Sequence, residues 1–179
     1  IASLGAYAKQ RIEEFKADTG REVEMEIEPG TFVVANSGHI ITRIIDKKFT
    51  NEMNFLIVDG GMELLTRPLL YGSEHPIYIV RQDGTLLSSE YDQAPADGLK
   101  SFGIVGRCCE SGDIIQPHVK LPADTCRGDV IAVCTTGAYN YSMASNYNRL
   151  PRPPIVMLAK DRAYEAVRRE TLEDLIALD

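Results

Sequence analysis

The stretch Phe55-Leu56-Ile57-Val58-Asp59-Gly60-Gly61-Met62 decides the fold: a short apolar run ends in an acidic, glycine-containing turn. Further short runs rich in β-branched residues lie at 40–45, 77–80, 103–105, 130–133 and 155–158. Runs of this length, separated by turn residues, are typical of the strands of a sandwich or barrel. We therefore predict that residues 31–179 form a mainly β domain.

The N-terminal segment has a different pattern. Residues 1–19 place apolar side chains at near-helical spacing, which predicts an amphipathic helix that ends at Gly20. Residues 23–27, Val-Glu-Met-Glu-Ile, alternate as a strand does and stop before Pro29. A helix followed by a strand is one step of an α/β layer. We expect residues 1–30 to be the last step of an α/β barrel whose earlier part precedes this chain.

Three shorter features are predicted from turn and capping residues. Gln82-Asp83-Gly84 favours a tight turn, and residues 92–98, which include Pro95, favour a loop. Thr171 precedes acidic residues and can cap a short terminal helix over 171–178.

Composition excludes several classes of protein. The 179 residues are 44% hydrophobic and 25% charged, which is globular rather than disordered. No apolar run approaches the roughly 18 residues of a membrane helix, so we expect no membrane partner. With 19 Lys and Arg against 26 Asp and Glu, the net charge of −7 disfavours nucleic acid. The four cysteines form no CxxC motif, which favours free thiols, no metal site and a cytoplasmic protein.

Several segments gather polar, aromatic and glycine residues within apolar surroundings: Glu28-Pro29-Gly30-Thr31, Arg67-Pro68-Leu69-Leu70-Tyr71, Cys109-Glu110-Ser111-Gly112-Asp113 and Gly137-Ala138-Tyr139. Each also has a purely structural interpretation. The glycine-containing segments can be simple turns. Cys109 can be a small core residue, and Arg67 can be one half of a surface ion pair.

Taken together with Asp59-Gly60-Gly61-Met62, and in this order, the segments resemble the pyridoxal-phosphate-dependent decarboxylases of diaminopimelate, ornithine and arginine, the diaminopimelate branch most closely. The resemblance covers residues 22–174. It implies a mainly β fold, the C-terminal β-sandwich or Greek-key barrel domain of that family, preceded by the last helix-strand step of the cofactor-binding α/β barrel. It also implies a homodimer with active sites at the interface.

The resemblance assigns pyridoxal 5'-phosphate to one group of residues. Glu28 would face the ring nitrogen, and Gly30 and Tyr139 would lie at the phosphate. Thr31 stands where the family usually has an arginine, so one charged contact is missing there. The lysine that holds the cofactor covalently would lie outside this chain, so the isolated chain is expected to be inactive.

The resemblance assigns substrate chemistry to a second group. Cys109 would donate the proton that replaces the departing carboxyl group, which a thiol near neutral pKa can do. Arg67 and Tyr71 would bind the distal carboxylate of a small amino-acid substrate. Glu110 and Ser111 would contact the distal end of the substrate. Cys109, Glu110 and Ser111 would all act in the active site of the neighbouring subunit.

Alternative functions remain open at this point. Thr31 is compatible with a related decarboxylase that acts on ornithine, on lysine, or on a carrier-bound or siderophore amino acid. The chain can also be a non-catalytic dimerisation module. A plain β-sandwich binding protein is the third alternative.

Overall fold

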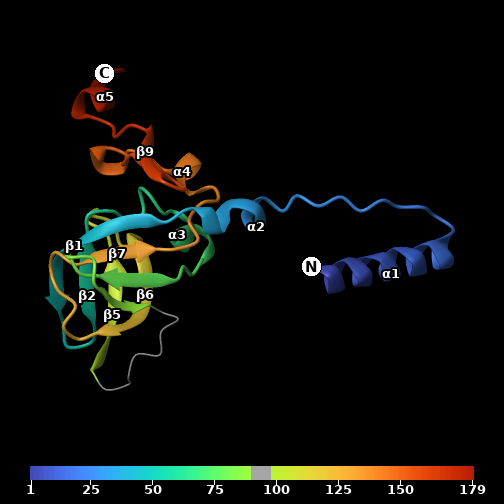
Figure 1. The fold of residues 1–179 in the computed structure, drawn as a ribbon, viewed down its shortest axis with the longest axis horizontal. Coiled ribbons are helices and arrows are strands. Elements are labelled where there is room, and N and C mark those ends of the chain that lie inside the picture. Colours follow the sequence, from blue (N-terminus) through green and yellow to red (C-terminus); the bar gives the residue numbers. More distant parts are fainter. Residues whose placement is uncertain (90–97) are drawn as a thin grey trace.

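The computed structural model describes residues 1–89 and 98–179 and is dominated by one mixed sheet of seven strands (Figure 1). The predicted loop at 92–98 lies almost entirely outside the described residues. The sheet has the order β4-β3-β7-β1-β2-β5-β6, and its neighbours are antiparallel except for β2 and β5. The strands are β1 (Ile40–Phe49), β2 (Asn54–Val58), β3 (Ile77–Val80), β4 (Leu86–Ser89), β5 (Leu99–Val105), β6 (Ile114–Pro122) and β7 (Val130–Val133).

The core lies on one face of this sheet. Alternate residues of β1, β2, β3 and β7 are buried, as the two-residue period of a strand requires. The edge strands β4 and β6 approach each other, so the sheet curls toward a barrel around its core. The predicted mainly β fold is confirmed.

The middle strand of the sheet comes late in the chain. β7 pairs with β1 on one side, Ile40 opposite Val133, and with β3 on the other, Ile77 opposite Val133. Strands that are distant in sequence are therefore joined through the four residues of β7.

The six predicted strands are confirmed as β1, β2, β3, β5, β7 and β8 (Ile155–Ala159), and three further strands were missed. β6 contains Pro117, which lacks the backbone N–H that a central strand needs, but β6 is an edge strand. β9 (Arg162–Val167) is rich in polar residues because it belongs to an exposed hairpin with β8. Among the described residues β4 pairs with β3 alone, and the predicted tight turn before it is confirmed at Gly84, whose φ is 88°.

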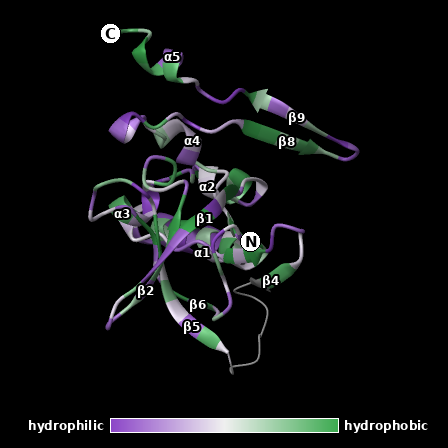
Figure 2. Ribbon diagram, turned by 90° about the vertical axis from the view of Figure 1, so that its left-hand side faces the viewer, coloured by the Kyte–Doolittle hydropathy of each residue, from purple (hydrophilic) through white to green (hydrophobic). Residues whose placement is uncertain are grey.

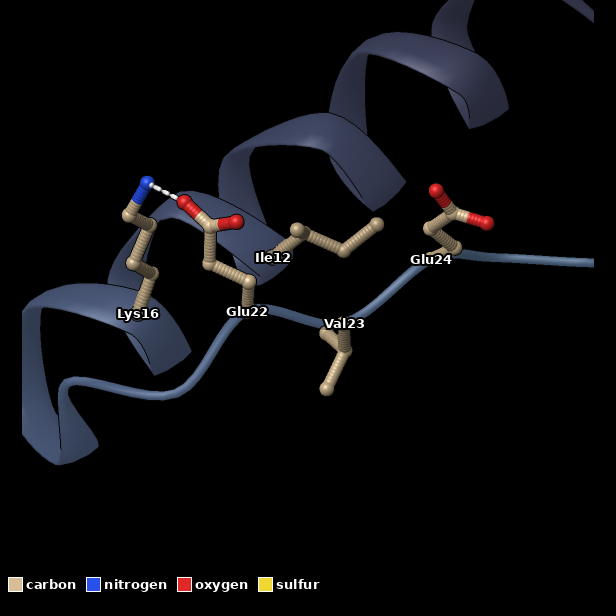
Figure 3. Close-up of a pocket in the computed structure, with 5 residues that line it drawn as sticks. All are labelled: Ile12, Lys16, Glu22, Val23 and Glu24. Carbon is tan, nitrogen blue, oxygen red and sulfur yellow. Dashed lines mark hydrogen bonds and ion pairs between the residues drawn. The ribbon is translucent and has the colours of Figure 1, made fainter.

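The helix predicted over 1–19 is confirmed as α1 (Ala2–Thr19), which ends at Gly20 with a φ of 70°. The strand predicted over 23–27 is wrong. These residues are extended and exposed, and no strand of the described residues pairs with them to satisfy their backbone groups. Instead Glu22, Val23 and Glu24 lie beside α1, and Glu22 forms an ion pair with Lys16 (Figure 3).

The C-terminal part lies beside the sheet rather than in it (Figures 1 and 2). It consists of α4 (Asn140–Met143), the single turn η2 (Tyr147–Arg149), the β8–β9 hairpin and α5 (Leu172–Ile176). The predicted terminal helix is confirmed. The Thr171 hydroxyl oxygen accepts from the Asp174 amide, and the Asp174 carboxylate accepts from the Thr171 amide. No helix among residues 1–89 and 98–179 has both the length and the apolar character of a bilayer span.

Candidate functional site

The short helix α3 (Arg67–Tyr71) carries the predicted substrate clamp. Pro68 occupies its first turn, and Gly72, at φ 62°, ends it. Arg67 and Tyr71 are four residues apart and therefore share one face. The guanidinium carbon of Arg67 lies 5.0 Å from the centre of the Tyr71 ring and 5.5 Å from that of Tyr139. The structure thus brings three predicted site residues together.

Tyr139 also reaches the predicted cofactor segment. A Cβ atom at Gly30 would lie 2.5 Å from the Tyr139 hydroxyl oxygen, so only glycine permits this approach. Tyr139 itself has a φ of 66°, a left-handed conformation that is uncommon for an aromatic residue and is concentrated at functional sites. The Gly30 amide donates to the Glu28 carbonyl at 2.9 Å, so an incoming phosphate would have to replace that bond.

Two further glycines explain why Gly30 and Tyr139 meet. Gly30 begins α2 (Gly30–Val34), a helical turn followed by η1 (Ala35–Ser37). A Cβ at Gly38 would lie 2.5 Å from the Gly137 Cα atom, and the Gly137 amide donates to the Ala35 carbonyl at 2.9 Å. The backbone before Tyr139 therefore packs directly on the segment that follows Gly30. Gly38 was missed by the sequence analysis because it has no motif of its own.

The predicted proton donor lies in the turn between β5 and β6. Cys109, Glu110 and Ser111 are all exposed. The Glu110 carboxylate accepts bonds from the Gly112 amide at 3.1 Å and the Ser111 hydroxyl at 3.3 Å, which holds the turn in shape. Cys109 is therefore not the small core residue of its structural interpretation.

This turn packs on a different face of α3 from the one that carries Arg67 and Tyr71. A Cβ at Gly112 would lie 2.6 Å from the Leu69 Cδ1 atom. Leu69 is two residues from both Arg67 and Tyr71, on the opposite side of the helix. In the part of the chain that the structure describes, no hydrogen bond or ion pair joins Cys109 to Glu28 or Tyr139. The contacts of the described residues therefore join Arg67 to Tyr71 and Tyr139 but do not include Cys109.

The neighbouring cysteine has a contrasting environment. Cys108 is half-buried, and its Sγ atom lies 3.8 Å from a carboxylate oxygen of Glu63. Burial, reinforced by the negative charges of Glu63 and Asp113, raises the pKa of the Cys108 thiol to about 12. Burial also raises the pKa of Glu63 above its ordinary value. Of the two adjacent cysteines, only Cys109 is exposed.

Glu63, Cys108 and Asp113 bring potential metal-ligand atoms within 4.8 Å of one another. The two Asp113 oxygens are already occupied, because they accept bonds from the amides of Met62 and Cys108, each at 2.7 Å. The raised pKa of Cys108 disfavours the thiolate that a metal needs. This cluster therefore has the character of a structural junction. Sequence reasoning quoted Asp113 only as part of a motif.

His75 is buried beside Arg67. Its Nδ1 atom lies 3.1 Å from the Cys134 carbonyl oxygen. Burial lowers the pKa of His75, and the positive charge of Arg67 acts in the same direction. Both effects favour the neutral form of the imidazole.

Comparison with known proteins identifies the family. The family described as "Pyridoxal-dependent decarboxylase, C-terminal sheet domain" matches residues 31–137, more than half of the chain. The chain belongs to this family of pyridoxal-dependent decarboxylases. The matched residues hold all seven strands of the sheet together with Arg67, Tyr71 and the Cys109 turn.

Individual decarboxylases match most of the chain. It is 42% identical to the diaminopimelate decarboxylase of Actinosynnema pretiosum, over 85% of this chain and 32% of that protein. It is 37% identical to that of Halalkalibacterium halodurans, over 98% of this chain and 38% of that protein. The crystal structure of the Helicobacter pylori enzyme with L-lysine superposes with a TM-score of 0.70 at 36% identity, over 84% of this chain and 34% of the other. The chain thus spans about a third of the length of these decarboxylases.

Proposed function

We propose that the protein is part of a pyridoxal-phosphate-dependent decarboxylase that converts meso-diaminopimelate to L-lysine and carbon dioxide. The observation that carries this proposal is the placement of Arg67 between two tyrosine rings beside Gly30. A guanidinium in this setting can bind a carboxylate through two hydrogen bonds. The relatives named diaminopimelate decarboxylase, one of them with L-lysine, support this substrate class.

The proposed domain division places a barrel remnant at residues 1–30 and the β-domain with its terminal helix at 31–179. Exposure supports this division. Val23, Met25 and Ile27 alternate like the residues of a strand but are 41%, 55% and 67% exposed. In the complete enzyme, neighbouring barrel strands would cover these side chains and pair with their backbone.

The residues present fit the cofactor. Gly30 has no side chain, which leaves a cradle at the Tyr139 hydroxyl where a phosphate oxygen can accept a hydrogen bond. Glu28, Gly30, Thr31 and Tyr139 would hold the cofactor on this chain. A lysine outside the chain would hold it covalently. When bound, pyridoxal phosphate supplies a sink for the electrons left by the departing carboxyl group.

The chain's own residues then divide the remaining work. Arg67 and Tyr71 bind the distal carboxylate. The other carboxyl group, at the reacting carbon, is not bound by them and departs as carbon dioxide. The Cys109 Sγ atom donates the proton that takes its place. Glu110 attracts the distal amine, and Ser111 lies next to it on the same turn.

We propose that the cysteine turn, residues 108–113 between β5 and β6, contributes to the active site of a second copy in a homodimer. Its exposed residues border the Leu69 side of α3, opposite Arg67 and Tyr71, and this placement supports delivery of the turn to a second copy. We also propose a cytoplasmic location, which the free thiols of the four cysteines support.

Thr31 supports one alternative, a related decarboxylase of an amino acid without a distal carboxylate, such as ornithine. An arginine at this position would add a second positive charge near the clamp, and a threonine does not.

The test is a substrate panel measured on the full-length product of the gene. We expect carbon dioxide release from meso-diaminopimelate. Arg67→Ala should raise KM for this dicarboxylate by about 10- to 100-fold, the loss of a charge-assisted bond, and should change KM for ornithine far less. Arg162→Ala is the matched control, because Arg162 lies 5.3 Å from the Tyr164 ring on the exposed hairpin and should leave both KM values unchanged.

Cys109→Ser should lower kcat while leaving KM within about threefold, since the proton is needed only after binding. Equal effects of Arg67→Ala on both substrates would remove Arg67 from the clamp. Preferred turnover of ornithine would favour the alternative substrate.

A further inference from the structure

Asp113 occupies an unusual place at the end of the cysteine turn. Its side chain is only 3% exposed, although it is a carboxylate on the surface hairpin between β5 and β6. Its two oxygens accept bonds from the amides of Met62 and Cys108, each at 2.7 Å. The Asp113 carbonyl also accepts from the Gly106 amide at 3.0 Å. One residue thus closes its own turn and reaches a loop about 50 residues earlier in the chain.

The Asp113 carboxylate packs closely against two glycines. A Cβ at Gly61 would lie 2.2 Å from Asp113 Oδ1, and a Cβ at Gly106 would lie 2.3 Å from both oxygens. Neither glycine has a positive φ, so the absent side chain, rather than backbone freedom, is what matters at both. Two glycines therefore leave just enough room for this carboxylate between the two loops.

The two amides that donate to Asp113 lie next to candidate site residues in the sequence. The Cys108 amide is one peptide before Cys109, and the Met62 amide belongs to the loop that runs into α3 and Arg67. A shift of the carboxylate would therefore move Cys109 relative to the sheet and to α3.

We propose that Asp113 is the positioning residue of Cys109, fixing the cysteine turn to the Asp59–Met62 loop so that the Sγ atom is presented in one place. This inference rests on the proposed function, because the placement of Cys109 matters only if Cys109 delivers a proton. Asp113 itself does not touch the substrate.

The chain offers a matched control for this role. Asp129 is also 3% exposed, and its carboxylate accepts from the amide of another cysteine, Cys126, at 2.8 Å. That bond closes only a local turn before β7. Asp129→Asn therefore removes the same charge from an equally buried turn that carries none of the candidate site residues.

The first experiment measures steady-state kinetics of the full-length protein. In Asp113→Asn, the amide cannot accept at both positions, so we expect kcat to fall about 10- to 100-fold, as for a misplaced reacting group. KM for meso-diaminopimelate should stay within about threefold, and the solvent deuterium isotope effect on kcat should rise as proton transfer becomes limiting. Asp129→Asn should keep kcat within about twofold, whatever its melting temperature. Equal loss of kcat in both variants, or a wild-type kcat in soluble Asp113→Asn, would overturn the proposal.

The second experiment needs no turnover and so separates this inference from the proposed function. Alkylation of Cys109 by iodoacetamide is followed by peptide mass spectrometry in the wild type and both variants. A changed rate in Asp113→Asn alone supports the positioning role even if no substrate is decarboxylated, and an unchanged rate contradicts it. If Asp113→Asn does not fold, Gly61→Ala displaces the same carboxylate without removing it, and the same outcomes apply.

Discussion

The curled sheet and the segments that flank it bury very different shares of their apolar side chains. Ile44, Leu56 and Phe102 are completely buried in the core of the sheet. In the flanking segments, by contrast, Phe32 is 71% exposed and Leu158 is 83% exposed. The sheet therefore carries its own hydrophobic driving force, whereas the flanking segments present apolar surface that this chain leaves uncovered. The proposed cofactor residues Glu28 and Gly30 lie in a flanking segment, and Arg67 and Cys109 lie on the margin of the sheet.

The largest effect that tests this contrast is the loss of a core side chain. Phe102→Ala should lower the free energy of unfolding by about 3–5 kcal/mol, through lost burial and the cavity that remains. Leu158→Ala on β8 should change it by less than about 0.5 kcal/mol. Chemical denaturation of residues 1–179 measures both. A loss at Leu158 as large as that at Phe102 would show that the hairpin is packed in solution.

A smaller effect distinguishes two acids by the sign of their pH dependence. Burial raises the pKa of Glu63, at the margin of the sheet, so the folded state retains its proton to higher pH than the unfolded state. The stabilisation from Glu63 is complete below its ordinary pKa of 4.5 and is lost as pH rises through the raised value. Glu63→Gln should therefore gain melting temperature relative to the wild type as pH rises from 4.5 to neutral.

Glu170, in the C-terminal flanking segment, should behave in the opposite way. Hydrogen bonds from Arg152, one of them 2.7 Å long, lower the pKa of Glu170 to about 2. Its stabilisation is present above pH 4.5 and is lost as pH falls through about 2. Glu170→Gln should be less stable than the wild type at neutral pH, and the deficit should shrink in acid. Slopes of the same sign for the two variants, measured by thermal melts from pH 3 to 8, would contradict this assignment.

The smallest effect concerns α1. Nothing lies within 4 Å of a Cβ placed on Gly5, and no residue of α1 is buried. Gly5→Ala should stabilise the helix by about 0.5–1 kcal/mol through backbone entropy alone. The far-ultraviolet helix signal of residues 1–179 should rise, while the melting temperature of the sheet stays unchanged. A coupled rise in both would mean that α1 packs on the sheet.

Local patterns predicted the elements that depend on local chemistry. Six strands, the cap at Thr171 and the helix end at Gly20 were correct, because periodicity and capping act over a few residues. The strand at 23–27 was wrong, because pairing depends on a neighbour that no local pattern contains. Polar edge strands such as β6 escaped prediction for the same reason, since tolerance of Pro117 depends on its position in the sheet.

In the candidate site, too, the sequence predicted which residues matter but not the long-range contacts that place them. The family resemblance located Arg67, Tyr71, Tyr139 and Cys109 in the sequence, and the structure adds that the first three are in contact. The contacts that place them, such as Gly38 against Gly137, join segments about 100 residues apart. The burial of Asp113 between two glycines likewise depends on a fold that brings the two loops together.

The position of β7 has a consequence for biosynthesis. Without β7, the sheet order falls into two pieces, β4-β3 and β1-β2-β5-β6, with no backbone ladder between them. While residues after 129 are still unsynthesised, the chain therefore has only two incomplete half-sheets, each of which lacks its β7 neighbour. Arrival of Val130–Val133 joins both edges at once, so closure of this domain waits for the last of its seven strands.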